Sequence, residues 1–159
     1  MKPKVYLETT IPSYLAARPS RDLLVAAHQQ LTRDWWEFRR THFDLYISEL
    51  VIQEIRAGDP AIAHERLRLL ADIPIVAVGD DIVGLVEDMV SGGPLPAKAV
   101  GDAVHIAIAT IYGFDYLLTW NCRHIANAEL FRALRRIVER RGFDLPALCT
   151  PEELMGERP

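Results

Sequence analysis

Residues 4–8 of the chain are Lys4-Val5-Tyr6-Leu7-Glu8, a short apolar run that ends on a carboxylate. Valine and tyrosine favour strands, so this run predicts a buried strand with a charge at its carboxyl end. Similar apolar runs occupy residues 44–47, 73–78, 116–119 and 146–149. Helical segments lie between them. This alternation predicts one α/β domain over residues 1–159, a three-layer α/β/α sandwich with a mainly parallel sheet of four to five strands.

The helical segments are bounded by residues that commonly start and stop helices. We expect helices over residues 20–40, 48–58, 59–70, 80–90, 99–112 and 127–142. Ser20 and Ser48 are expected as N-caps, and Asp59 with Pro60 forms a third helix start. The segment Thr9-Thr10-Ile11-Pro12 also has turn and helix-start chemistry. Pro74 cannot donate a backbone hydrogen bond, so it is expected either in an edge strand or at the start of its strand.

The composition is typical of a soluble globular protein. Of 159 residues, 50% are hydrophobic and 25% are charged, proportions that allow a sizeable buried core. The apolar run near the N-terminus is too short for a signal peptide, and no segment has the length of a membrane span. Cys122 and Cys149 form no metal-binding or redox motif. We therefore expect a cytoplasmic protein without a membrane-spanning segment and with both thiols reduced.

The charges are unevenly distributed, although the net charge of −4 does not by itself indicate a nucleic-acid partner. Arginines cluster along the last predicted helix, at positions 132, 135, 136, 140 and 141. A basic helix can bind phosphates in a chain that is acidic overall. A solvated helix face, or an interface for an acidic partner, explains the same cluster equally well.

Four oxygen-bearing side chains follow predicted strands or lie on the next helix: Glu8, Glu54, Asp102 and Asn121. Each alone has an ordinary explanation as a strand end, a helix acid, an N-cap or a turn residue. The carboxyl ends of parallel strands gather at one sheet edge, however, and three carboxylates placed there would repel one another without a cation. The set therefore predicts a site for a hard metal ion.

Several neighbours of these four residues are candidates for supporting roles. Thr9 and Thr10 could donate hydrogen bonds to a substrate, and Arg123 and His124 could contact phosphate. His105 lies one helical turn after Asp102, on the same side of the helix. We expect it to be a satisfied core group or to support a ligand, and not to bind the metal itself.

The ordered set resembles the PIN-domain family of metal-dependent ribonucleases, and within it the VapC-type toxins of toxin–antitoxin pairs. The matching pieces span roughly residues 4–127 and are Tyr6-Leu7-Glu8-Thr9-Thr10, Ser48 to Glu54, Gly101-Asp102-Ala103-Val104-His105-Ile106-Ala107 and Leu118-Thr119-Trp120-Asn121. There are two departures from the family pattern. The family usually has aspartate where this chain has Glu8, and often a fourth acid where it has Asn121.

The resemblance implies an endoribonuclease that hydrolyses RNA phosphodiester bonds with Mg²⁺ or Mn²⁺. Glu8 and Asp102 would be direct metal ligands, Glu54 would bind the metal or orient a water as base, and Asn121 would position a water or a phosphate. Asn121 lowers the negative charge of the site, which makes a second metal ion less favourable.

The resemblance also implies an antitoxin protein as partner. The apolar face between Leu23 and Phe38, with the pair Trp35-Trp36, is the candidate docking surface or homodimer interface; an internal core with one exposed tryptophan is the alternative. Three other functions stay open. A catalytically degenerate RNA- or protein-binding module is the main one. A phosphatase of the haloacid-dehalogenase type is disfavoured because Thr9 and Thr10 follow Glu8, and a Rossmann domain lacks its GxGxxG motif.

Overall fold

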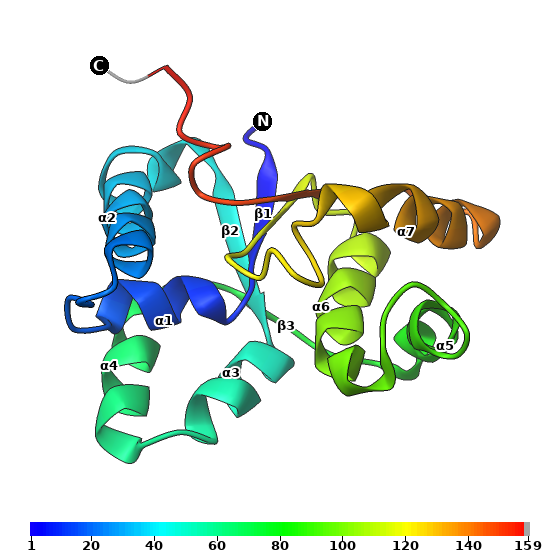
Figure 1. Ribbon diagram of the computed structural model, residues 1–159, viewed down its shortest axis with the longest axis horizontal. Coiled ribbons are helices and arrows are strands. Elements are labelled where there is room, and N and C mark those ends of the chain that lie inside the picture. The colour runs from blue at the N-terminus through cyan, green and yellow to red at the C-terminus, as the bar shows by residue number, and fades with distance from the viewer. Residues whose placement is uncertain (158–159) are drawn as a thin grey trace.

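The computed structural model describes residues 1–157 and contains a five-stranded sheet in the order β3-β2-β1-β4-β5 (Figure 1). Every neighbouring pair of strands is parallel. The strands are β1 (Lys4–Leu7), β2 (Asp44–Ser48), β3 (Ile75–Val76), β4 (Tyr116–Leu118) and β5 (Ala147–Cys149). The predicted parallel sheet is therefore confirmed, with β1 at its centre and the proline-preceded β3 at an edge.

Helices cover both faces of the sheet, as the three-layer prediction requires. They are α1 (Thr10–Ala16), α2 (Leu23–Phe38), α3 (Glu49–Arg56), α4 (Pro60–Leu69), α5 (Val83–Val90), α6 (Val100–Ile111) and α7 (Ala128–Arg140). Figure 1 shows α1, α2 and α4 on one side of the strands and α5, α6 and α7 on the other. This arrangement leaves the carboxyl ends of the strands between the two helical layers.

Two local expectations need correction. Ser20 is not the N-cap of α2: that helix begins at Leu23, and the Asp22 carboxylate accepts the hydrogen bond from the Val25 N–H. The third strand covers only Ile75–Val76 of the expected residues 73–78. Aspartate caps a helix as well as serine does, so the composition around residues 20–22 could not separate the two positions.

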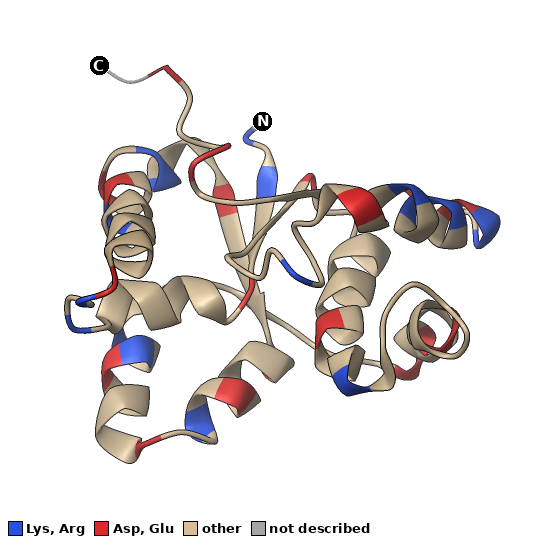
Figure 2. Cartoon of the chain, viewed as in Figure 1, with Lys and Arg blue, Asp and Glu red and all other residues tan. Residues whose placement is uncertain are grey.

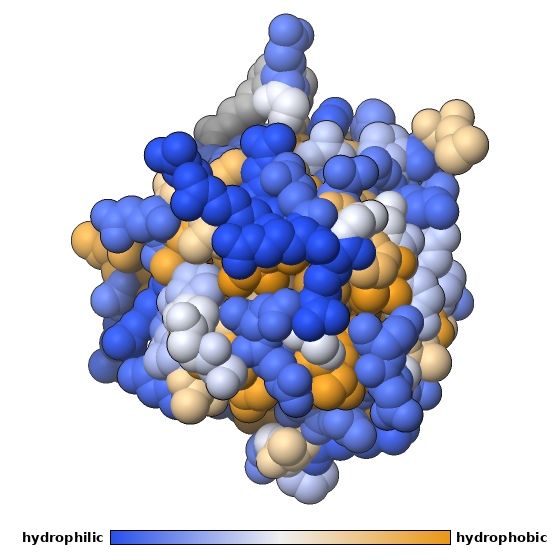
Figure 3. Space-filling view, turned by 90° about the vertical axis from the view of Figure 1, so that its right-hand side faces the viewer, coloured by the Kyte–Doolittle hydropathy of each residue, from blue (hydrophilic) through white to orange (hydrophobic). Residues whose placement is uncertain are grey.

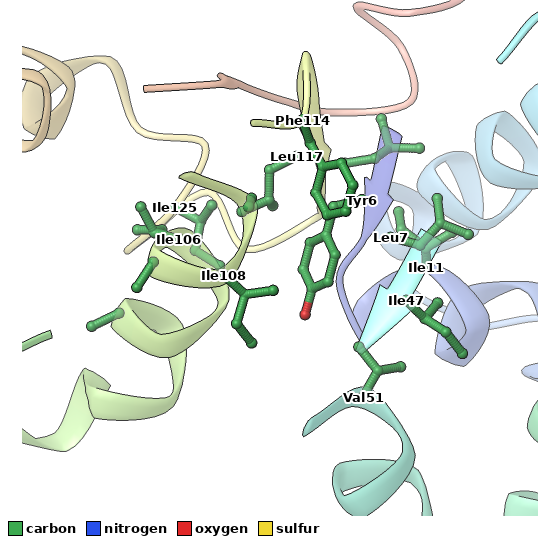
Figure 4. Close-up of a cluster of buried hydrophobic side chains, with 14 of the residues drawn as sticks. Tyr6, Leu7, Ile11, Ile47, Val51, Ile106, Ile108, Phe114, Leu117 and Ile125 are labelled. Carbon is green, nitrogen blue, oxygen red and sulfur yellow. The ribbon is translucent and has the colours of Figure 1, made fainter. Parts of the chain in front are cut away.

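The core is continuous across the sheet. Val5, Tyr6 and Leu7 are fully buried, so both faces of β1 are covered, as is usual for parallel strands. Figure 4 shows side chains of β1, β2, α3 and α6 gathered around them. Among the described residues, no helix is long and apolar enough to cross a membrane.

The apolar face of α2 divides between core and surface. Trp35 is fully buried and belongs to the core, whereas Leu23, Leu24 and Phe38 are exposed. Trp36 is half-buried, with the Arg40 guanidinium over its ring. The proposed Trp35-Trp36 docking pair is therefore corrected: Trp35 is not available to a partner, and any docking surface on α2 lies nearer its two ends.

Replacing a buried core side chain should cost more stability than the same change at the surface. Ile47 on β2 is fully buried, whereas Ile62 on α4 is 49% exposed. Ile47→Ala should lower the free energy of unfolding by about 2–5 kcal/mol, because a cavity adds to the reduced burial. Ile62→Ala should change it by less than about 0.5 kcal/mol. Urea denaturation of both variants checks this, and equal losses would contradict the core assignment.

Candidate functional site at the carboxyl edge of the sheet

The candidate site forms where the three central strands end. Glu8 follows β1 directly, and its backbone N–H donates to the Leu118 carbonyl at the end of β4. Glu54 is carried by α3, which starts immediately after β2 and is capped by Ser48. Asp102 is in the first turn of α6, and Asn121 lies beyond β4. Parallel pairing thus brings residues more than 100 positions apart to one edge.

Glu8 is a buried carboxylate, with only 4% of the residue exposed. Its two oxygens accept the Thr10 backbone N–H at 3.1 and 2.9 Å, and Oε2 also accepts the Thr119 hydroxyl at 3.4 Å. Burial raises the pKa of Glu8; the charge of Glu54 raises it further, while His105 and the Thr10 hydrogen bonds oppose the rise. A buried carboxyl group whose pKa is raised in this way is typical of a functional site.

Glu54 lies beside Glu8 and is more open, with 42% of its side chain exposed. Its Oε1 accepts the Thr9 hydroxyl at 2.9 Å and is also hydrogen-bonded to His105 Nε2. Burial raises the pKa of Glu54, but the hydrogen bonds from His105 and Thr9 lower it, so the pKa lies below its usual value. Glu54 therefore stays ionised next to a carboxylate that resists ionisation.

Asp102 and Asn121 meet through a second histidine. His124 Nδ1 lies 3.0 Å from Asp102 Oδ2, and the His124 backbone N–H donates to Asn121 Oδ1 at 3.0 Å. Thr119 connects this pair to Glu8, because its hydroxyl oxygen accepts the Asn121 backbone N–H at 2.9 Å. The structure thus brings together Glu8 with Glu54, and Asp102 with Asn121, on adjoining parts of one edge.

The side chains of Glu8, Glu54 and Asp102 do not surround a common metal position. Within residues 1–157, no three His, Cys, Asp or Glu side chains are placed so that they could hold a metal ion. The donor chemistry nevertheless fits a hard cation, because all three acids offer carboxylate oxygens, and Mg²⁺ commonly takes one or two carboxylates and completes its shell with water. The edge therefore offers oxygen donors of the type that hard cations bind, but the described residues do not form a three-residue cage.

The four residues expected to contact substrate have different surroundings. The Thr9 hydroxyl donates to Glu54 within the protein, whereas the Thr10 hydroxyl oxygen accepts the Trp120 backbone N–H at 2.8 Å. His124 is paired with Asp102. Arg123 is exposed, so its guanidinium remains free to meet a ligand in this structure.

Sequence reasoning missed three groups that build the site. Tyr6 contacts His105, Thr119 joins the two halves, and Ser48 contacts Tyr6. Tyr6 and Thr119 sit within or directly after apolar strands, where their hydroxyls give no periodic signal. The one sequence signal for Tyr6 and Thr119 was that each lies two positions before a candidate site residue, Glu8 or Asn121, within a segment that resembles the PIN family.

Comparison with known proteins gives structural matches alone. No protein-family model matches the sequence, and no curated protein matches it. A solved structure of VapBC2 from Rickettsia felis, bound to a DNA fragment from their promoter, superposes with a TM-score of 0.56 at 13% identity, over 92% of this chain and 98% of that one. VapC20 of Mycobacterium tuberculosis, described as a Sarcin-Ricin loop cleaving toxin, gives 0.57 at 13% identity, over 76% and 92%.

The chain has the VapC-type PIN fold. This confirms the fold that the sequence resemblance implied, because the matched region covers most of both chains. At 13% identity the likeness concerns the fold, and the chemistry must be argued from the residues at the edge of this chain.

The burial of Glu8 predicts an unusual pH dependence of stability. Folding raises the pKa of the Glu8 carboxyl, so this group contributes most to the free energy of unfolding at pH values below its unfolded pKa. The contribution is lost as the pH rises through the folded pKa. Glu8→Gln should therefore raise the free energy of unfolding at neutral pH, in buffer with a chelator, and the gain should disappear near pH ~4. Exposed Glu37→Gln should change it by less than about 0.5 kcal/mol. Denaturation curves across pH test this; a destabilised Glu8→Gln protein at neutral pH would contradict it.

Proposed function

We propose that this chain is a metal-dependent ribonuclease that hydrolyses RNA phosphodiester bonds, and that it is the toxin of a toxin–antitoxin pair. One observation carries the proposal: a buried carboxylate, Glu8, lies beside an ionised one, Glu54, at the carboxyl edge of a VapC-type sheet. Ion-pair networks that serve only stability would neutralise such a charge and would not bury it next to another acid.

Each acid at the edge would have its own part in the chemistry. Glu8 and Asp102 would hold Mg²⁺ or Mn²⁺, and Glu54 would bind it directly or through a water. The ion, when bound, would supply Lewis acidity to the phosphate and lower the pKa of a water. Glu54 is kept ionised by its neighbours, so it would accept a hydrogen bond from the attacking water and orient it, although its lowered pKa weakens it as a base. Asn121 would position a water or a phosphate oxygen.

RNA is the proposed substrate class because flexible single strands and loops can bend into an open edge. Arg123 is exposed one residue before His124, the partner of Asp102. Figure 2 shows the arginines along α7 in blue, and Figure 3 shows hydrophilic side chains crossing that face of the molecule. These cations could neutralise the flanking phosphates.

An antitoxin chain is the proposed protein partner. The matched VapBC2 proteins were solved bound to their promoter DNA, and this supports looking for a paired chain here. The exposed side chains of Leu23, Leu24 and Phe38 on α2 offer apolar contact area to such a chain or to a second copy of this one.

A second candidate function is a binding module without catalysis. The absence of a three-residue metal group among residues 1–157 favours it, as do the histidines that already engage Glu54 and Asp102. Titration calorimetry with Mn²⁺ separates the two functions. Binding at millimolar metal supports the nuclease, and no heat change at that concentration supports the module.

Asp102→Asn should abolish cleavage without unfolding the protein. The amide keeps the size of the side chain but removes the charge, so cleavage of a single-stranded RNA with Mn²⁺ should fall by at least about 100-fold. Exposed Asp72→Asn should retain wild-type activity. Gel assays of RNA and of a matched DNA oligonucleotide, with circular dichroism of each variant, measure this. Full activity in Asp102→Asn would reject the assignment.

Arg123→Ala should weaken RNA binding in a salt-dependent way. A cation that neutralises one phosphate of a single strand contributes about 0.7 to the slope of log affinity against log salt. We expect the slope to fall by that amount in Arg123→Ala and to stay unchanged in Arg21→Ala, which removes an exposed arginine from the loop before α2. Fluorescence anisotropy with a labelled RNA at several salt concentrations gives both slopes. An unchanged slope in Arg123→Ala would exclude this phosphate contact.

A further inference from the structure

A buried series of hydrogen bonds leads from the core to Glu54. Ser48 Oγ at the end of β2 lies 2.8 Å from the Tyr6 hydroxyl of β1, and that hydroxyl lies 2.6 Å from His105 Nδ1 on α6. His105 Nε2 then contacts Glu54 Oε1. Ser48, Tyr6 and His105 are each at most 2% exposed. The series therefore joins four elements of the fold and reaches solvent only at Glu54.

The direction of these bonds follows from the donors available. Ser48 Oγ accepts the Val51 backbone N–H at the start of α3, so its own proton is free to be donated to the Tyr6 oxygen. Burial raises the pKa of Tyr6, which therefore keeps its proton. A phenol that accepts from Ser48 donates in turn to His105 Nδ1. The remaining imidazole proton is then on Nε2, where it faces the Glu54 carboxylate.

Packing holds the imidazole in this orientation. The His105 ring lies 5.8 Å from the Tyr6 ring, at 48° to it, and the Tyr6 ring stacks on Phe114 with centroids 6.0 Å apart. A buried imidazole costs less free energy when both of its nitrogens are hydrogen-bonded. A ring turned by 180° would place carbon atoms where Nδ1 and Nε2 now meet Tyr6 and Glu54, and both hydrogen bonds would be lost.

We propose that His105 is a positioning residue, which accepts from Tyr6 at Nδ1 and orients Glu54 by donating from Nε2. Glu54 Oε1 then receives two donors, His105 and Thr9, while among the described residues Oε2 receives none. Since 42% of the Glu54 side chain is exposed, this second oxygen is left available to water or a ligand. The core thus decides which oxygen of Glu54 faces water or substrate. The consequence for catalysis rests on the proposed ribonuclease function.

The first test reads the tautomer directly and needs no enzymatic activity. In protein with ¹⁵N-labelled histidines, long-range proton–nitrogen spectra at neutral pH should show His105 with an unprotonated Nδ1 and a protonated Nε2. The resonance is assigned by its disappearance in His105→Gln. Tyr6→Phe, which removes the donor, should shift Nδ1 and leave exposed His64 unchanged. Protonation at Nδ1, whether in the other tautomer or in an imidazolium, would overturn the proposal.

The second test compares variants that keep or remove the Nε2 donor. Supporting residues of this kind are worth about 10- to 100-fold in metal affinity or activity. His105→Leu should reduce RNA cleavage by that factor, with KM little changed, whereas His105→Gln, whose amide can still donate to Glu54, should reduce it by less than about 10-fold. His64→Gln, the same change at an exposed site on α4, is the control.

These two tests separate failure of the positioning role of His105 from failure of the proposed ribonuclease function. Equal losses of activity in folded His105→Leu and His105→Gln would overturn the positioning role. Wild-type protein that cleaves no RNA would overturn the ribonuclease proposal, and the nitrogen spectra would still decide the hydrogen-bond direction. Circular dichroism of each variant identifies an unfolded protein, and for such a variant the decision passes to the wild-type spectra.

Discussion

Parallel hydrogen bonding on both sides of β1 is the interaction on which the rest of the structure depends. Tyr6 pairs with Tyr46 on one side and with Leu117 on the other, so β1, β2 and β4 end near one another. Parallel strands need long crossovers, and these place the helices on both faces. Both the buried core and the carboxyl edge follow from this one arrangement.

That arrangement imposes a conflict at Glu8. The residue directly after a central strand is still within the core, yet here it is a carboxylate beside Glu54. The Thr10 backbone N–H and the Thr119 hydroxyl reduce the cost of burial without removing it. Sites that do chemistry commonly hold groups in environments that folding alone would avoid, and the core elsewhere must supply the compensating stability.

Two histidines form hydrogen bonds to the acids at the carboxyl edge of the sheet. Each of the two acids carried by helices has its own imidazole, His105 for Glu54 and His124 for Asp102. These pairs orient the carboxylates in place of a cage around one ion. The acids carried by α3 and α6 are therefore held in place by the protein itself.

Much of this protein could be predicted from its sequence. The apolar runs, the caps and the alternation of strands with helices predicted the sheet, and Glu8 could be placed at the end of a strand, because these signals are local. The N-cap of α2 was misplaced by two residues, since Ser20 and Asp22 are equivalent in local chemistry. The spacing after Asp102 also indicated that His105 would be a satisfied core group or a support for a ligand, and the structure places it in the core with both nitrogens hydrogen-bonded.

Only the tertiary structure decided how the side chains are paired. Tyr6, Ser48 and His105 are up to 99 positions apart, and their hydrogen bonds depend on rotamers chosen by three-dimensional packing. The same is true of Trp35, whose place in the core no helical pattern could distinguish from a docking surface. The sequence by itself determined which side chains follow the strands, because strand signals are local. Only the tertiary structure decided which of these side chains form hydrogen bonds with one another, because those bonds join elements that are distant in the sequence.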